Sequence, residues 1–206
     1  MRIRTAMAMV ALGLTVSACG SQAGSGGPIT GSAAASQPST SATGAWAPIT
    51  DPSGVSFEFP TGVAPTVSTS SGSTTRTYIA KAGGEAVASI VIIPTPVALD
   101  VKNFFVQYPI KLKAQGNTSI KSNGVRTFSM QGFKGFQTTV TYVSPPLKAG
   151  SAPSYVVEER EAIQMPKYFI VISAVAGNSH ALTSADIAQA KAVNAQLLRG
   201  FRSGTK

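Results

Sequence analysis

The sequence predicts an α+β domain in which an antiparallel sheet of about six or seven strands is sandwiched between two helices, an α/β/α arrangement. After Trp46, short segments rich in β-branched and aromatic residues are separated by Gly, Pro and Ser. Several of the links are short, which favours antiparallel neighbours because parallel pairing needs a crossover of about a dozen residues or more. Two amphipathic segments, one after Asp100 and one after Thr183, are available to cover the sheet.

The first predicted strands form the N-terminal part of the domain. Residues 55–59 alternate apolar and polar side chains and stop at Pro60, which is typical of a half-buried strand. Strands over residues 75–81 and 86–93 follow, joined by a turn that contains two glycines. The second of these ends in the continuous apolar run Ile90–Ile93, which predicts a central strand covered on both faces.

Two helices are predicted from their capping residues and apolar stripes. Asp100 is placed to cap the first helix, which Pro109 should kink or interrupt. The second helix opens with Thr183 and Asp186, a capping-box pattern with Asp in place of Glu, and should run to about Arg199. The stripes are Val101, Phe104, Phe105 and Tyr108 in the first helix, and Ile187, Ala190, Leu197, Leu198 and Phe201 in the second.

Four further strands are predicted between the two helices. Two of their connections, 131–135 and 165–167, are short enough for hairpins. The predicted order is therefore three strands, a helix, four strands and a closing helix. The four strands cover residues 125–131, 136–144, 155–164 and 168–175.

The chain divides into a removable leader, a tether and one domain. Residues 1–18 have the features of a signal peptide: a basic start, an apolar run too short to span a membrane, and small residues before a cut between Ala18 and Cys19. Residues 19–46 are almost entirely small or polar and carry no charge, which predicts a disordered tether. Residues 47–206 have the size of one ordinary domain.

Cys19 is the only cysteine of the chain and stands at the predicted cleavage site. Because the chain offers no second cysteine for a disulfide, acylation explains this position best. Diacylated on its sulfur, Cys19 would become the first residue of the mature chain and hold it at the extracytoplasmic face of the cell membrane. The alternatives are an ordinary signal peptide that contains a cysteine, or a free thiol in the tail. We expect a protein that is anchored to a membrane and does not span it.

The chain is basic, with 17 Lys and Arg against 8 Asp and Glu and a net charge of +9. No consecutive basic residues occur, and an extracytoplasmic address also argues against nucleic acid as a partner. The surplus charge either keeps the surface soluble or attracts anionic lipids and acidic envelope polymers. The densest basic spacing, and so the candidate contact with an anionic surface, is Lys111, Lys113, Lys121, Arg126 and Lys134.

The sequence offers little catalytic chemistry, and we expect no enzyme activity, no metal and no cofactor. His180 is the only histidine, so metal centres built on Cys or on several His are excluded. The segment Gly177–Ala181 resembles a nucleophile elbow around Ser179, but it lacks the second glycine, and His180 is too close in sequence to serve as the base. A polar turn is the simpler interpretation.

Glu158, Glu159, Arg160 and Glu161 form the only dense charge cluster. On a strand, Glu159 and Glu161 share one face with their carboxylates about 7 Å apart, whereas Glu158 and Arg160 share the other. Such a carboxylate pair is compatible with glycoside hydrolysis. The simpler expectation is a solvated outer face, paired with a Lys or Arg of the neighbouring strand.

The order of elements resembles the PsbP-like fold over roughly residues 47–201. The resemblance rests on the strand Gly54–Pro60, an Ile-rich strand before a Phe-rich helix, a pair of hairpins, and the closing segment Leu197–Arg202. The chain is most similar to the LpqN-type lipoproteins of actinobacteria, which share the lipobox (here Val16–Cys19), the tether and a single domain of this size. The resemblance implies a binding or scaffolding module without catalytic residues, and it specifies no partner.

These observations favour a membrane-anchored, non-enzymatic lipoprotein whose domain binds an envelope component or another protein. A small carrier of lipid or glycolipid is the alternative, and it would need an apolar cavity of ligand size, whereas a binding module has a packed core and an exposed patch. A hydrolase centred on Ser179 is a third, minor alternative.

Overall fold

The computed structural model describes residues 45–70, 73–82, 86–95, 100–146 and 150–203. The predicted signal peptide, Cys19 and nearly all of the predicted tether lie outside the described residues and stay predictions. Among the helices in these ranges, none is both long and apolar enough to cross a membrane.

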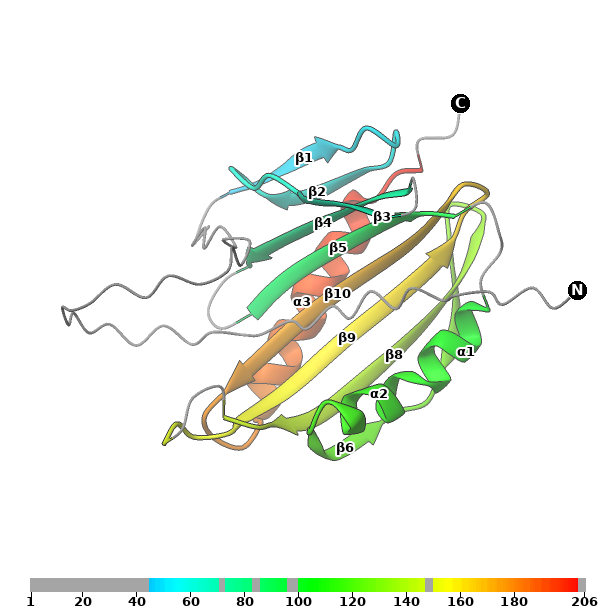
Figure 1. The fold of residues 1–206 in the computed structure, drawn as a ribbon. Coiled ribbons are helices and arrows are strands. Elements are labelled where there is room, and N and C mark those ends of the chain that lie inside the picture. The colour runs from blue at the N-terminus through cyan, green and yellow to red at the C-terminus, as the bar shows by residue number, and fades with distance from the viewer. Residues whose placement is uncertain (1–44, 71–72, 83–85, 96–99, 147–149, 204–206) are drawn as a thin grey trace, which may run out of the picture.

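The described strands form an eight-stranded antiparallel sheet and a separate two-stranded hairpin (Figure 1). The order in the large sheet is β3-β4-β5-β10-β9-β8-β6, and β7 also pairs with β8. The hairpin is β1-β2. The strands are β1 (Trp46–Thr50), β2 (Ser56–Pro60), β3 (Thr66–Ser70), β4 (Ser73–Lys81), β5 (Ala86–Pro94), β6 (Thr118–Ser122), β7 (Arg126–Met130), β8 (Phe133–Ser144), β9 (Ser154–Gln164) and β10 (Tyr168–Asn178), and the helices are α1 (Val101–Val106), α2 (Tyr108–Ala114) and α3 (Ser184–Gly200).

The predicted α+β class with an antiparallel sheet is confirmed, but the predicted number of strands was too low. Ten strands in two sheets are described, and β1, β3 and β6 were not expected. The sequence of β3 is Thr66–Ser70, entirely polar apart from Val67, and all five residues are exposed. Because such an edge strand buries no face, it has no apolar alternation to reveal it.

The helix boundaries follow the predicted signals. The Asp100 carboxylate accepts a hydrogen bond from the backbone of Asn103 at 2.9 Å and caps α1. Gln107 then separates α1 from α2, with Pro109 at the start of α2, where its missing N–H costs nothing. Thr183 and Asp186 form the reciprocal capping box of α3.

Helices cover both faces of the sheet. Behind the sheet in Figure 1, α3 packs against β10, β9, β5 and β2, while α1 lies in front of β8 and β9 and α2 contacts β6. The run Ile90–Ile93 is covered on both sides as predicted: Ile90 and Ile92 belong to the core beneath α3, and Val91 packs with Val101 and Phe105 of α1.

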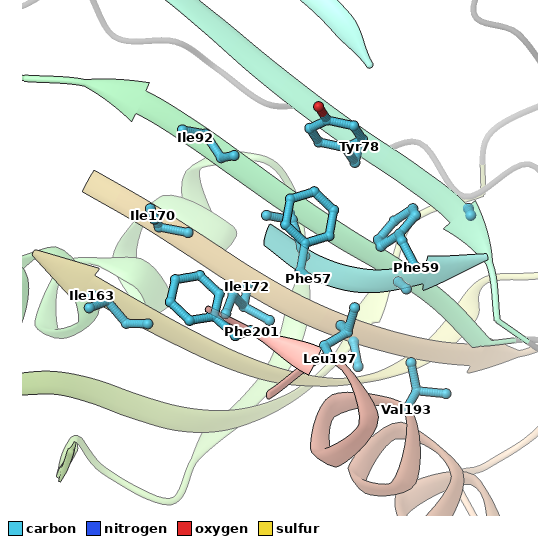
Figure 2. Close-up of a cluster of buried hydrophobic side chains, with 14 of the residues drawn as sticks. Phe57, Phe59, Tyr78, Ile92, Ile163, Ile170, Ile172, Val193, Leu197 and Phe201 are labelled. Atoms are coloured by element: carbon cyan, nitrogen blue, oxygen red, sulfur yellow. The ribbon is translucent and has the colours of Figure 1, made fainter. Parts of the chain in front are cut away.

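The main core lies between the sheet, α3 and the hairpin β1-β2. Figure 2 shows this cluster, in which side chains from β2, the central strands and α3 meet. Phe57 packs edge-on against Tyr78 with ring centroids 4.9 Å apart, a favourable aromatic geometry. The labelled residues are Phe57, Phe59, Tyr78, Ile92, Ile163, Ile170, Ile172, Val193, Leu197 and Phe201.

The two ends of the described domain are joined to each other. Arg202 and Ser56 exchange backbone hydrogen bonds of 2.6 and 3.0 Å just after α3 ends. At Gly200 a Cβ atom would lie 2.3 Å from the backbone nitrogen of Glu58, so glycine is needed where α3 crosses β2. The hairpin is held at its turn as well, where the Tyr78 hydroxyl donates to Asp51 at 2.8 Å.

Candidate functional site

The strongest departure from an ordinary core is the run of charged residues in β9. Glu158, Glu159 and Glu161 are 1 %, 8 % and 2 % exposed. The expected solvated outer face is therefore wrong. The strand is central, because β8 and β10 pair with it on either side. One of its faces is turned toward α2 and the other toward α3.

On the side of α1 and α2, Glu158 and Arg160 form a closed ion pair. Arg160 Nε lies 2.8 Å from Glu158 Oε1 and also donates to Ser173 Oγ at 3.1 Å. From the start of α2, the Tyr108 hydroxyl donates to the other oxygen of Glu158 at 2.5 Å. The Tyr108 ring lies over the guanidinium, 4.0 Å from its central carbon. Both charges are thus partnered inside the protein.

The electrostatics of this side keep Tyr108 neutral and Arg160 charged. Burial raises the pKa of Tyr108, and the nearby Glu158 raises it further, so the phenol stays protonated. Burial lowers the pKa of Arg160, but Glu158 and the tyrosines outweigh that effect and leave it raised. The ion pair and the hydrogen bond from Tyr108 to Glu158 fasten the start of α2 to the sheet. The sequence placed Glu158 and Arg160 on one face but gave no sign of Tyr108 as their partner.

On the α3 side, Glu159 and Glu161 share one face, as predicted from strand alternation. Asn194 of α3 donates through Nδ2 to Glu161 Oε1 at 2.6 Å. Thr139 of β8 donates through Oγ1 to Glu159 Oε2 at 2.8 Å. Glu159 Oε1, Glu161 Oε2 and Asn194 Oδ1 are buried and have no hydrogen-bond partner among the described residues. Of the ion pairs found in those residues, none involves Glu159 or Glu161.

Glu161 is electrostatically unfavourable in its charged form. Burial raises its pKa to about 8, and the neighbouring Glu159 and Glu158 contribute to the rise, although the hydrogen bond from Asn194 opposes it. Near neutral pH, Glu161 therefore holds a proton in a large part of the molecules. Asn194 was missed from the sequence. The available signal was a polar residue in the apolar stripe formed by Ala190, Val193 and Leu197.

Ser179 and His180 lie in an exposed turn after β10. The His180 backbone donates to Asn178 Oδ1 at 3.1 Å, and its ring Nδ1 lies 3.1 Å from the carbonyl oxygen of Ala181. The ring is therefore engaged with the adjacent backbone. This local geometry is that of a polar turn.

The five basic residues of the predicted anionic contact are distributed over two sides of the sheet. Lys111 and Lys113 stand in the last turn of α2. Lys121 and Arg126 face the α3 side. Lys121 pairs with Thr141, which lies opposite Val157 of the main core. Arg126 pairs with Gln137, which lies opposite Glu161. Lys134 of β8 follows the alternation to the α1 side.

The outer face of α1 and α2 carries a feature that the sequence analysis missed. Val106 and Ile110 are 49 % and 60 % exposed, and lysines at helical spacing flank them on both sides, Lys102 before and Lys113 after. We call these four residues the α1–α2 stripe. The sequence contains no acidic residue between Asp100 and Glu158, so the whole surrounding segment is basic. The sequence signal for this stripe was the helical spacing of its four residues, at i, i+4, i+8 and i+11.

Comparison with known proteins finds structural similarity only. No family model matches the chain, and no curated protein matches it. Cyanobacterial PsbP (CyanoP) from Synechocystis is similar at 12 % identity and a TM-score of 0.46, over 82 % of this chain and 97 % of that one. The Ran-binding protein Mog1p of Saccharomyces cerevisiae is similar at 14 % identity and a TM-score of 0.44, over 78 % of this chain and 96 % of that one. Similarity at this level assigns the chain to no family and transfers no function to it.

Proposed function

We propose that the protein is a membrane-anchored, extracytoplasmic binding module without enzymatic activity, and that the α1–α2 stripe is the surface it presents to its partner. The partner that fits is the anionic headgroup layer of the membrane to which Cys19 is predicted to tie the chain. The observation that carries the proposal is the exposure of Val106 and Ile110 between lysines, in a segment without acidic residues.

The chemistry of the stripe matches a lipid surface. Apolar side chains on the outer face of a helix gain free energy by entering the boundary between headgroups and acyl chains. Lysines beside them are each worth about 1 kcal/mol near an anionic leaflet. Such contacts are weak individually, but a lipid anchor raises the effective concentration of the domain at the membrane, so weak contacts suffice to orient it.

The packed interior supports binding at the surface over binding in an enclosed cavity. Ile90, Ile92, Ile170 and Ile172 are fully buried and belong to one continuous cluster beneath α3. The same cluster includes side chains of α3 and β2, and Figure 2 shows Phe57 of β2, Val193 and Leu197 of α3 meeting the isoleucines of the sheet. A carrier of lipid or glycolipid would need ligand-sized space in such a layer.

The test is vesicle co-sedimentation of the chain from residue 20 to 206, which lacks the predicted acylation site but keeps every described residue. Vesicles of phosphatidylcholine alone are compared with vesicles that also contain phosphatidylglycerol. We expect binding only to the anionic vesicles, weakened by salt because surface charges are screened. The double variant Val106→Ser with Ile110→Ser should lower the affinity roughly tenfold, which corresponds to about 1.4 kcal/mol.

Val67→Ser provides the matched control. Val67 is 56 % exposed on β3, at the opposite edge of the sheet, so its loss removes apolar surface comparable to that of Val106 but outside the stripe. This variant should bind anionic vesicles like the wild type. Equal binding to both kinds of vesicle, or equal losses for the stripe and control variants, would overturn the assignment of the α1–α2 stripe.

A further inference from the structure

Three buried oxygen atoms without a hydrogen-bond partner in the described residues come from the facing surfaces of β9 and α3. They belong to Glu159, Glu161 and Asn194, which are all at least nine-tenths buried. Asn194 Nδ2 bonds to Glu161, so its amide lies directly against that carboxylate. An unpaired buried oxygen costs about 1–3 kcal/mol, and three together are a large cost for one small region.

Asn194 adds a third, uncharged ligand group to the two carboxylates of β9. It stands on the core face of α3 among Ala190, Val193 and Leu197, where an apolar residue is the rule. Its amide nitrogen is satisfied, whereas its carbonyl oxygen has no donor within the described residues. The helix thus supplies a third oxygen, independent of the two carboxylates of β9.

A proton cannot satisfy this arrangement alone. One proton shared between carboxylates joins two acceptor oxygens at most, and the third is left without a partner. A cation that takes oxygen ligands accepts all three kinds of oxygen, and two carboxylates supply the charge to neutralise it. Thr139, which donates to the far oxygen of Glu159, holds that carboxylate in orientation in the way outer partners of metal ligands do.

We propose that Glu159, Glu161 and Asn194 bind a divalent cation that prefers oxygen ligands, of the class of Mg²⁺, Ca²⁺ and Mn²⁺, between β9 and α3. Carboxylate and amide oxygens are the ligands these ions take, and waters commonly complete their shells. The described residues contain no group of three or more His, Cys, Asp and Glu arranged for a metal, so the amide oxygen is essential to the site. The proposal is independent of the lipid-binding function.

The test is thermal unfolding of the chain from residue 20 to 206, treated with chelator and then titrated with MgCl₂, CaCl₂ or MnCl₂. At a cation concentration about a hundredfold above Kd, Tm should rise by roughly 5–10 °C for at least one of the three. Glu159→Gln and Glu161→Gln should abolish the rise. Bound Mn²⁺, followed by electron paramagnetic resonance, should disappear in the same variants.

Folding of the variants does not obscure the result. Glutamine has the shape of glutamate and removes a buried charge, so metal-free Glu161→Gln should unfold no lower than the metal-free wild type. Asp100→Asn is the matched control, because it makes the same chemical change at an exposed helix cap where Asn is tolerated. The control should keep the full cation response. A wild-type Tm that none of the cations moves, or equal shifts in the wild type and both Glu variants, would overturn the proposal in favour of a proton-sharing pair.

Discussion

Replacing Arg160 by methionine tests whether the ion pair of β9 is as closed as its geometry indicates. The change removes the positive partner that lies 2.8 Å from Glu158, a residue that is 1 % exposed. It also takes away the donor to Ser173 and the cation beneath the Tyr108 ring. Methionine fills much of the vacated volume, so the main effect is a carboxylate left without a counter-charge inside the protein.

The expected loss is large for a single substitution. Breaking a buried ion pair by removing one partner costs about 3–5 kcal/mol, because the remaining charge stays desolvated. In a domain of this size each kcal/mol lowers Tm by about 2–4 °C, so Tm should fall by roughly 6–20 °C. Arg199→Met, at an exposed position in the last turn of α3, is the control and should cost less than about 1 kcal/mol.

A triple variant separates stranded charge from lost packing. Tyr108→Phe, Glu158→Met and Arg160→Met together remove both charges and the hydroxyl that donates to Glu158. Apolar replacement of a buried pair is often neutral or stabilising, so the triple variant should recover most of the stability. Urea unfolding with linear extrapolation measures each free energy. A loss below about 1 kcal/mol for Arg160→Met alone, or a triple variant as unstable as the single one, would refute this reasoning.

Three further outcomes are expected. Because the pKa of Glu161 is raised from 4.5 to about 8, folding takes up a proton between these values, so stability should fall by roughly 1 kcal/mol per pH unit from about pH 5 to 8 in metal-free urea titrations. Glu161→Gln should flatten that slope, and parallel slopes would contradict the burial of this carboxyl. Gly200→Ala should cost about 1–3 kcal/mol through its clash with Glu58, measured by urea unfolding, and an unchanged midpoint would argue against this contact. Cys19→Ala should release the protein into the medium, whereas retention in the membrane fraction with unchanged mass would contradict lipidation.

Local signals were sufficient for the central elements. The Asp100 cap, the break at Pro109 and the capping box at Thr183 depend on neighbouring residues alone, so the sequence predicts them directly. The apolar run Ile90–Ile93 was sufficient to place β5 in the middle of the sheet. The edge strands β3 and β6 were not predictable in this way, because their mostly exposed residues are selected for solubility and not for packing.

The site shows the same division between local and distant causes. Strand alternation correctly placed Glu159 and Glu161 on one face, because the side-chain period of two is a property of the backbone. Their burial was not predictable, since it depends on pairing with β8 and β10 and on α3 crossing above them. Asn194 is 33 positions from Glu161, and only the packed fold brings the two together.

A central strand tolerates four consecutive charges because alternation sorts them into two different sets. Glu158 and Arg160 fall on one face and form an ion pair, so the charges on that side balance each other, while Glu158 Oε1 accepts no hydrogen bond from the described residues. Glu159 and Glu161 fall on the other face with an amide and no cation, so three oxygens of that side have no hydrogen-bond partner among the described residues. The two faces should therefore respond differently to solution conditions: cations and pH should change stability through the α3 side. The Arg160→Met loss should change little with cation, because Glu158 has the smallest of the effects that shift the pKa of Glu161. A cation that rescued Arg160→Met as well would show that the two sides are not independent, and the assignment of the site to the α3 side would fail.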